Sequence, residues 1–587
     1  MSPPVLLLVT FAAAAVIAAL AGLACAPLAH RLGAVARPRG DRWHQRPIPL
    51  LGGVAIAAGT FAAIMPFDPG APLFVIVAGG AACVAVGLID DLWPLKPQTK
   101  LTAQLLVAAA VVSAGLRLPV TGVIWLDMLL SLLWLVALSN AFNLLDNMDG
   151  LAAGVAAIAA IGHLLLFAAT GQLAAATLAA ALAGACGGFL LHNFHPARMF
   201  MGDAGSLFLG FTVGGLSLVA SAGTPAGSPM ALLLPGLIVM VPIFDSAFVT
   251  VHRVAAGRPI SQGGRDHASH RLVAAGFSER QAVVALYAAG AASALVALAT
   301  ARYGLGDTGI AIALLGVGVV LFGVFLGRVG GEAAAAADTA AVRRLPAASS
   351  YGRQAGAFAI DVLLVALAYY TAYRLRFEQT YEAEEPLFVA SLPLVVAAKM
   401  VAFAMLRTYQ GLWRHTSLAD LVRLAQAVVL GGVFAVLGVL AAFRFHNYSR
   451  ALFVVDGVLL FLFLGGSRVA ARLMAEGLRP RPIGRKPIVI YGAGEAGLMV
   501  LRETRANGAL GREAVAFLDD DPTLARTDVH GVRVAGGSDR LEDLLRTTPV
   551  AEVVISSSKI APERLAHVRD VCDTHGVTVV RSVLRFE

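Results

Sequence analysis

Charged residues are scarce in this sequence and make up 14% of its 587 positions. Soluble globular proteins carry roughly 25%. Because 58% of the residues are hydrophobic, the composition excludes an ordinary soluble protein and indicates a chain with many membrane spans. Cysteine is also scarce. The four cysteines have neither the spacing of a disulfide framework nor that of a metal site, so we interpret them as core residues.

The sequence also lacks a basic segment that would indicate nucleic-acid binding. Its net charge of +8 comes from residues in the loops between apolar runs, a pattern typical of membrane topology. The first apolar run has no basic residue before it and is too long for a typical signal sequence. We therefore expect it to remain as a membrane helix.

Apolar runs of about 20 residues, long enough to cross a bilayer, recur along the chain. We predict eleven spans and then four more, with approximate limits 4–29, 50–66, 72–89, 101–115, 123–142, 151–170, 173–191, 206–221, 230–250, 282–300, 309–327, 356–375, 386–406, 424–443 and 451–467. The predicted domains are a polytopic domain (1–328), a cytoplasmic linker (329–355), a four-helix membrane region (356–470) and a soluble domain (471–587).

Basic residues are concentrated in alternate loops of the polytopic domain. One set of loops contains Arg31, Arg37, Arg39, Arg42, Arg46, Lys96, Lys100, Arg253, Arg258, Arg265 and Arg271. The positive-inside rule places these loops in the cytoplasm. Counting spans from there also places the soluble domain in the cytoplasm.

Seven acidic and amide residues lie at span ends on this same side: Asp90, Asp91, Asn143, Asp146, Asp149, Asn193 and Asp203. A carboxylate in or beside hydrocarbon is costly unless something compensates its charge, so such residues are usually functional. Their number indicates a site for a divalent metal and a charged substrate.

Asp90 and Asp91 end the third span, close to Lys96 and Lys100. Adjacent carboxylates repel each other unless a cation lies between them. An oxygen-rich site with basic neighbours suits Mg²⁺ and a phosphate, because Mg²⁺ is usually held by one or two carboxylates, water and phosphate oxygens. The pair is equally typical of a solvated helix end, and both interpretations stay open.

The segment NAFNLLDNMDGLAAG places Asn143, Asp146 and Asp149 three residues apart. On a helix, this spacing puts them nearly on one face. Gly150 lets the chain break there and approach a ligand closely. A helix cap would explain one of the three polar residues, so the segment favours a binding site.

In NFHPARMFMGDAGSLF, Asn193 and Asp203 flank a proline-containing turn, in which we expect Phe200 to be exposed. The small residues that open the next span can direct N–H groups at an anion. The loop segment RDHASHRL adds His267, His270 and Arg271. Two histidines beside an arginine, opposite an acidic site, favour a clamp for a diphosphate.

These segments, with Asp41 and His44 in the first basic loop and Gly52-Gly53 after it, resemble the polyprenyl-phosphate N-acetylhexosamine-1-phosphate transferase family. Its superfamily includes the phospho-N-acetylmuramoyl-pentapeptide transferases. The resemblance covers residues 1 to about 328. It implies transfer of a sugar 1-phosphate from a UDP-sugar to undecaprenyl phosphate, release of UMP, and Mg²⁺ or Mn²⁺ at the cytoplasmic face of a bacterial inner membrane.

The resemblance also implies roles for individual residues. Asp90, Asp91 and Asp203 match the residues that handle the metal. The residues expected in catalysis are Asp90, Asp91, Asp146, His267 and His270. Those expected to bind substrate are Asn143, Asp149, Asn193, Phe200, Lys100 and Arg271, with Asp149 and Phe200 near the uracil. Ser269 stands where many relatives have a third histidine, a departure that bears on the sugar preference.

The soluble domain alternates predicted strands and helices, as in a parallel α/β sheet. The segment YGAGEAG places Gly492, Gly494 and Gly497 between a strand and a helix, and Asp519 follows the next strand. This order is typical of a Rossmann-like dinucleotide site. The expected fold is thus a polytopic α-helical membrane protein with a cytoplasmic α/β domain. Occupation by NAD(P), by another nucleotide or by no ligand stays open.

Residues from about 350 to 587 resemble the N-terminal region of membrane-bound polysaccharide-biosynthesis proteins related to nucleotide-sugar epimerases and dehydratases. No tyrosine stands four residues before a lysine, so the YxxxK pair of short-chain dehydrogenases is absent. We expect a regulatory or docking module here. Nucleotide-sugar modification or sensing at the membrane remains the alternative to the transferase.

The partners that follow from this reading are a UDP-sugar, undecaprenyl phosphate and membrane lipid, and not a nucleic acid. N-acetylglucosamine is the default sugar, and the product would initiate a lipid-linked glycan of the cell envelope. A homodimer and a contact with other glycan-assembly enzymes are both left open.

Overall fold

The computed structural model describes residues 1–36, 47–68, 70–255, 264, 266–337, 348–377, 381–406, 408, 418–444, 449–477, 486–506, 510–525, 527–557 and 560–582. The chain divides into two compact units, Met1–Arg479 and Pro480–Glu587. The first unit contains both predicted membrane regions.

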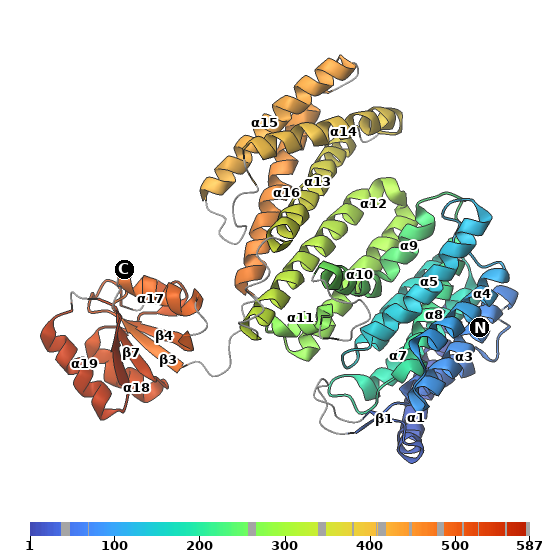
Figure 1. Ribbon diagram of the computed structural model, residues 1–587, viewed down its shortest axis with the longest axis horizontal. Coiled ribbons are helices and arrows are strands. Elements are labelled where there is room, and N and C mark those ends of the chain that lie inside the picture. The colour runs from blue at the N-terminus through green and yellow to red at the C-terminus, as the bar shows by residue number, and fades with distance from the viewer. Residues whose placement is uncertain are drawn as a thin grey trace. The chain divides into compact units, whose positions relative to one another are not determined.

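The first unit is almost entirely helical (Figure 1). Its helices are α1 (Pro3–Leu32), α2 (Gly52–Ile64), α3 (Gly70–Leu92), α4 (Pro97–Ser113), α5 (Ile124–Leu145), α6 (Leu151–Ala169), α7 (Leu173–Asn193), α8 (Gly202–Ser221), α9 (Met230–Ile238), α10 (Met240–Ala255), α11 (Ala268–Ala274), α12 (Glu279–Ala337), α13 (Ala348–Arg376), α14 (Tyr381–Met405), α15 (Leu418–Phe443) and α16 (Arg450–Gly477). Two short strands, β1 (Val35–Ala36) and β2 (Ile48–Pro49), pair antiparallel before α2.

The helices follow from the apolar runs of the sequence. Hydrocarbon offers no hydrogen-bond partners, so a spanning segment must satisfy its own backbone, as a helix does. Proline stands in the first turn of α1 and of α4, at Pro3 and Pro97, where its missing N–H removes no helical hydrogen bond. Every predicted span overlaps one of these helices.

Ten helices in the described part of the chain are long and apolar enough to cross a membrane. The number is eleven if α9 and α10, bent by 88°, form one span. The chain is thus a polytopic membrane protein. The total predicted from the sequence is fifteen. It is higher because α2 and α4 are short, with 13 and 17 residues, because two predicted spans fall in α12, and because α13 is not among the ten.

Helix α12 consists of two helical segments that meet at Gly304, whose φ of 83° and ψ of 167° are not helical. Its two ends lie on the same side of the helical bundle. Arg271, on α11 just before Glu279, donates a hydrogen bond of 3.0 Å to the carbonyl of Leu326. A straight helix between Glu279 and Leu326 would be about 70 Å long. The chain therefore reverses at Gly304, as two separate spans require.

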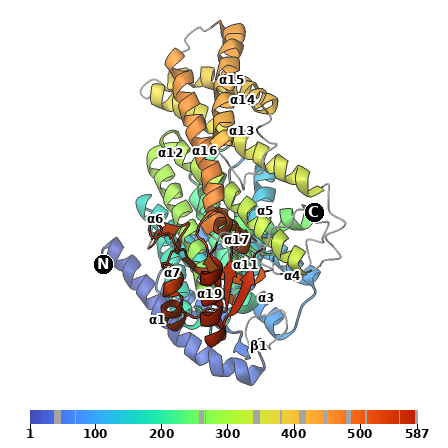
Figure 2. The ribbon, with the colours of Figure 1, turned by 90° about the vertical axis from the view of Figure 1, so that its left-hand side faces the viewer.

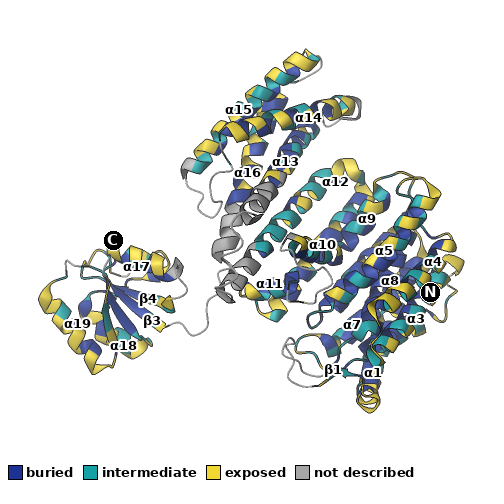
Figure 3. Ribbon diagram, in the orientation of Figure 1, coloured by how far each residue is buried: buried dark blue, intermediate teal, exposed yellow. Residues whose placement is uncertain are grey.

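Helix α8 is the central helix of the first unit. It packs against α2, α3, α5, α6, α7 and α9, and 89% of its most apolar stretch is buried, compared with 22% in α1 (Figure 3). The outward face of α1 carries exposed residues such as Leu8, Val16 and Leu23. Because α8 has almost no lipid-facing surface, its first residue, Gly202, is fixed by packing on all sides.

Helices α13, α14, α15 and α16 pack into a bundle with two internal ion pairs (Figure 2). Lys399 of α14 pairs with Asp456, and both side chains are fully buried. Arg468 lies 2.9 Å from Asp361 of α13. Asp456 and Arg468 both belong to α16 and lie about 18 Å apart along it. Since an unpaired charge is costly in this environment, the two pairs fix the position of α16 along its neighbours.

The second unit contains a four-stranded parallel sheet with strand order β4-β3-β7-β8 (Figure 1). Its elements are β3 (Lys486–Tyr491), α17 (Glu495–Ala506), β4 (Arg512–Leu518), β5 (Asp528–Val529), β6 (Val532–Arg533), a 3₁₀ turn (Ser538–Arg540), α18 (Leu541–Thr547), β7 (Glu552–Ile555), α19 (Pro562–Thr574) and β8 (Thr578–Arg581). The predicted alternation of strands and helices is confirmed, and the strands are parallel as expected.

Both faces of this sheet are covered because side chains alternate along a strand. Val489 and Tyr491 of β3 belong to one core, which includes Val568 of α19. Ile490 belongs to the other core, with Leu501 of α17. The unbroken apolar strand KPIVIY follows from this two-sided burial.

The Lys399–Asp456 pair yields a double-mutant prediction. Lys399→Met should lower the free energy of unfolding by about 3–5 kcal/mol, because Asp456 would stay buried without a cation. Lys399→Met combined with Asp456→Leu should recover most of this loss, because neither charge remains. Unfolding of the purified protein by titration with sodium dodecyl sulfate measures both values. A double variant as unstable as the single one would contradict the assigned pairing.

Candidate functional site

Helix ends that are far apart in the sequence meet in the first unit. They are the end of α3 with Asp90 and Asp91, the start of α4 with Lys100, the end of α5 with Asn143, and the start of α8 with Asp203. Contacts to Asp203, or to the backbone beside it, join these ends. The structure thus brings together motifs that the sequence separates by more than 100 residues.

Asp91 holds the N-terminus of α8. Its Oδ1 accepts a hydrogen bond of 2.8 Å from the N–H of Asp203, and its Oδ2 accepts one of 3.0 Å from the N–H of Ala204. The first N–H groups of a helix lack intrahelical partners and carry partial positive charge, so a carboxylate stabilises them. Gly202 makes this approach possible. Its φ is 67°, and a Cβ there would lie 2.5 Å from Oδ2 of Asp91.

Lys100 supplies a positive charge to the site. Its Nζ lies 3.2 Å from Oδ2 of Asp90 and also forms an ion pair with Asp203. Asp90 in addition accepts a hydrogen bond of 2.6 Å from the N–H of Leu95. The two adjacent carboxylates therefore contact different partners. Asp90 faces Lys100 and Asp91 faces α8, so the pair is separated.

Asn143 completes the surroundings of Asp203. Its Nδ2 donates hydrogen bonds of 2.9 Å to Oδ1 of Asp203 and to Oγ of Ser206. Asp203 therefore has an ammonium on one oxygen and an amide on the other. Ser206 was not predicted from the sequence, although the segment GDAGS contains it.

Asp146 directly follows α5 and lies near three other carboxylates. Burial, together with the negative charges of Asp203, Asp91 and Asp149, raises the pKa of Asp146 to about 8. Like charges disfavour the ionised form of a carboxyl group. We call Asp90, Asp91, Asp146 and Asp203 the acidic cluster. Its charge exceeds what Lys100 alone can balance.

The predicted shared helix face of Asn143, Asp146 and Asp149 is wrong. Helix α5 ends before Asp146, and Gly150, with φ of 77°, precedes α6. Asp149 therefore lies in a turn. Its Oδ2 accepts a hydrogen bond of 2.9 Å from the N–H of Ala197. The three-residue spacing assumed a continuous helix, and that assumption fails at Leu145, where α5 ends.

Asn193 connects the loop between α5 and α6 to the loop between α7 and α8. It is buried, its Oδ1 accepts a hydrogen bond of 3.0 Å from the N–H of Gly150, and its Nδ2 donates one of 2.8 Å to the carbonyl of Met199. Phe200 was expected to be exposed and is half-buried. Its carbonyl accepts a hydrogen bond of 3.0 Å from the N–H of Gly52.

His267 is buried against a carboxylate that sequence analysis missed. Its Nδ1 lies 2.7 Å from Oδ2 of Asp245 in α10, whose Oδ1 accepts a hydrogen bond of 2.8 Å from the N–H of Ala268. The ring of His270 lies 6.3 Å from that of His267. The available signal was an aspartate inside the apolar run MVPIFDSAF.

Arg271 was expected to bind substrate, but its contacts lie within the protein. It is buried and donates hydrogen bonds to the carbonyls of Leu326 (3.0 Å) and Asp266 (3.2 Å). Ser269 connects α11 to the turn after α5 through a hydrogen bond of 2.6 Å to Oδ1 of Asn147. The segment RDHASHRL therefore anchors α11 beside the site.

Two residues of the resemblance, Asp41 and His44, lie outside the described residues. His195 and Glu279 were not predicted from the sequence, although both lie beside Asp149. Nδ1 of His195 lies 3.0 Å from Oδ2 of Asp149 and 3.1 Å from Oε2 of Glu279. No short motif contains these three residues, because they come from three separate segments.

In the second unit, Gly492 and Gly494 lie in the turn between β3 and α17, and Gly497 lies in the first turn of α17. A Cβ at Gly497 would lie 1.9 Å from the carbonyl oxygen of Gly492, so this close approach requires glycine. Oδ2 of Asp519 accepts a hydrogen bond of 2.7 Å from the N–H of Ala493. In this structure the Asp519 carboxylate holds the turn between β3 and α17.

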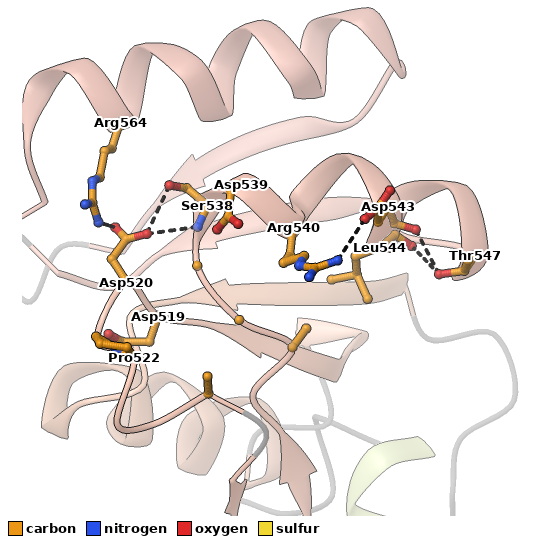
Figure 4. Close-up of a pocket in the computed structure, with 14 residues that line it drawn as sticks. Asp519, Asp520, Pro522, Ser538, Asp539, Arg540, Asp543, Leu544, Thr547 and Arg564 are labelled. Atoms are coloured by element: carbon orange, nitrogen blue, oxygen red, sulfur yellow. Dashed lines mark hydrogen bonds and ion pairs between the residues drawn. The ribbon is translucent and has the colours of Figure 1, made fainter.

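A cavity of about 800 Å³ is lined by the segment that follows β4, by residues 535–540, by α18 and by Arg564 of α19 (Figure 4). At its edge, Asp520 lies 2.7 Å from Nη1 of Arg564 and accepts a hydrogen bond of 2.9 Å from the N–H of Ser538. The hydroxyl of Tyr491 also donates to it. Partial burial acts in the opposite direction, but these donors lower the pKa of Asp520 to about 2.

The contact of Asp91 with α8 predicts a strong effect of Gly202→Ala. The variant should lose about 1–3 kcal/mol of stability, because alanine is strained at this φ and its Cβ would clash with Asp91. Thermal unfolding of the purified protein provides the measurement. Gly187→Ala is the matched control, since a Cβ at Gly187 meets no atom within 4 Å. Equal stability of the two variants would show that the contact is not tight.

The surroundings of Asp520 predict acid sensitivity of the second unit. The folded pKa of about 2 lies below the unfolded value of about 3.9. The stability that the ionised carboxylate contributes is therefore complete above about pH 4 and is lost as the pH falls towards 2. Urea unfolding of the segment 480–587 at several pH values tests this. Asp520→Asn should flatten the dependence, whereas Asp543→Asn, in an exposed pair with Arg540, should preserve it.

Two family models match the chain. Residues 73–221 match glycosyl transferase family 4, and residues 404–581 match a CoA-binding domain. The first match extends from α3 to the end of α8 and contains the acidic cluster. The second begins at the end of α14 and includes the sheet of the second unit.

Curated relatives match between about a third and a half of the chain. A probable undecaprenyl-phosphate N-acetylglucosaminyl 1-phosphate transferase of Bacillus subtilis (strain 168) is 34% identical over 274 residues, 45% of this chain and 76% of the relative. A decaprenyl-phosphate N-acetylglucosaminephosphotransferase of Mycolicibacterium smegmatis is 35% identical over 340 residues, which cover 50% of this chain and 81% of the relative. A phospho-N-acetylmuramoyl-pentapeptide-transferase of Moorella thermoacetica is 38% identical over 215 residues, which cover 32% of this chain and 67% of the relative. With these similarities and the acidic motifs in place, the chain belongs to glycosyl transferase family 4, as a polyprenyl-phosphate sugar-1-phosphate transferase.

Proposed function

We propose that the chain transfers N-acetylglucosamine 1-phosphate from its UDP-sugar to undecaprenyl phosphate and releases UMP. The product initiates a lipid-linked glycan of the bacterial cell envelope. The observation that carries the proposal is the convergence of Asp90, Asp91, Lys100, Asn143 and Asp203 at the ends of apolar helices. The names of the relatives support the sugar and the lipid class.

The position of the cluster suits an acceptor with one end in the bilayer. Helices of membrane length end at the cluster, so a phosphate at the membrane surface can reach it while the isoprenoid tail stays in hydrocarbon. The basic loops favour the cytoplasmic side. We therefore assign the enzyme to the inner membrane, with its site facing the cytoplasm.

A divalent cation fits the chemistry of the cluster. The donors are carboxylate oxygens, which Mg²⁺ and Mn²⁺ prefer. Lys100 pairs with both Asp90 and Asp203, and one ammonium balances only one of these two carboxylates, so a dication would offset the negative charge that remains. The residues that would hold it are Asp90, Asp91 and Asp203. It would supply neutralisation of the charge on the diphosphate.

The proposed reaction is direct attack by the acceptor. An oxygen of the lipid phosphate forms a bond to the phosphorus that carries the sugar, while the bond from that phosphorus to the bridging oxygen breaks and UMP leaves. Lys100, which now bridges Asp90 and Asp203, supplies positive charge to the incoming phosphates. Asp91 keeps Asp203 in place through the backbone of α8. No aspartyl intermediate is needed, because the acceptor is already anionic and nucleophilic.

The test uses purified protein, undecaprenyl phosphate, Mg²⁺ and a panel of UDP-sugars, with UMP release as the readout. We expect release that requires lipid and is abolished by EDTA. Asp91→Asn and Asp203→Asn should each lower the rate about 100-fold or more. Asp68→Asn, at an exposed loop aspartate, is the control and should retain the wild-type rate.

The possible outcomes separate the functions. UMP release without lipid would indicate a nucleotide-sugar hydrolase. Silence across the panel in well-folded protein would contradict the transferase and favour a nucleotide-sensing role. A phosphorylated aspartate trapped at Asp90 or Asp91 would overturn direct attack while leaving the overall reaction intact.

A further inference from the structure

A second group of metal-ligand residues lies next to the acidic cluster and shares no residue with it. Asp149 belongs to the turn between α5 and α6, His195 to the connection between α7 and α8, and Glu279 to the first turn of α12. Nδ1 of His195 is 3.0 Å from Oδ2 of Asp149 and 3.1 Å from Oε2 of Glu279. The three ligand atoms all lie within 4.8 Å of one another.

The charges of this group are not balanced by the protein. An imidazole nitrogen carries one hydrogen at most, but two carboxylates face it here. A protonated His195 would balance one negative charge, and a neutral one would balance none. Within the described residues, neither Asp149 nor Glu279 has a lysine or arginine partner. Two carboxylates this close to each other favour a cation between them.

The distances between the ligand atoms match those between neighbouring ligands of one metal ion. Ligand atoms about 2.0–2.2 Å from an ion, at roughly a right angle, lie about 3 Å apart, and both N–O distances have this value. The side chains are 34%, 20% and 20% exposed, so an ion and its water ligands can enter. The N–H of Ala197 donates to Oδ2 of Asp149 and orients it, as partners outside the coordination shell do in metal sites.

The ligand types select the class of metal. One imidazole nitrogen with two carboxylate oxygens suits Zn²⁺ and similar transition-metal ions, whereas Mg²⁺ prefers oxygen ligands alone. The group thus differs in chemistry from the acidic cluster, which offers only oxygen. The four cysteines are all buried, so thiolates do not compete for such an ion.

We propose that Asp149, His195 and Glu279 form a binding site for a transition-metal dication, with Zn²⁺ as the best fit. The ion cross-links three segments of the first unit. One of them is the connection that carries Phe200 and leads into α8, so the ion restrains the loop that precedes Asp203. A hydrogen bond of 3.1 Å from Nε of Arg280 to the carbonyl of His195 supports the same connection from the protein side.

Binding of Zn²⁺ to the full-length protein tests the proposal without any measurement of turnover, so its result is independent of the proposed function. Equilibrium dialysis in excess Mg²⁺, which occupies oxygen-only sites, should detect one Zn²⁺ per chain. His195→Gln and Glu279→Gln should each weaken binding about tenfold or more, since loss of even a partner outside the coordination shell has an effect of this size. Zn²⁺ should also raise the thermal unfolding midpoint of the wild type and not of these variants.

Two controls separate this site from others. His192→Gln removes a histidine three positions away, which contacts the carbonyl of Ala19 at 2.9 Å, and should bind Zn²⁺ as the wild type does. Asp203→Asn alters the acidic cluster and should also leave the affinity unchanged. Equal affinities of wild type, His195→Gln and Glu279→Gln, or no bound Zn²⁺ at all, would overturn the proposal. Glu279→Gln keeps the test decisive if the histidine variant does not fold.

Discussion

The contact between Asp91 and the first turn of α8 is the interaction on which the geometry of the site depends. A carboxylate at the edge of hydrocarbon needs compensation, and the helix N-terminus supplies it through two backbone N–H groups. Because α8 is packed on all sides, this contact transmits the position of α3 directly to Asp203. Lys100 and Asn143 then act on a carboxylate whose place is already fixed.

The same solution recurs at α11. Asp245 of α10 accepts from the backbone at Ala268 and pairs with His267, so a carboxylate from one helix again holds the start of another. The amide of Asn193 acts similarly, because it joins the connection between α5 and α6 to the connection between α7 and α8. Polar side chains at helix ends thus hold the helices in position and are at the same time candidate ligands.

The sequence was sufficient for the membrane helices, for the parallel sheet and for the family, because each depends on local patterns or on contiguous motifs. It was not sufficient for partners that come from distant segments. The grouping of Asp149 with His195 and Glu279 requires three connections to be placed in space, and no spacing rule includes them. The error over Asp149 arose because α5 ends at Leu145, whereas the prediction extended the helical periodicity as far as Asp149.

The burial of α8 has a consequence for which substitutions this protein can accept. A helix such as α1 presents leucines and valines to lipid, so one apolar side chain there can replace another with little effect. On α8 nearly every position touches another helix, and a change in volume would shift the first turn and the carboxylate on it. Substitutions in the loops around the helix ends can therefore change the surroundings of the site without moving this central helix.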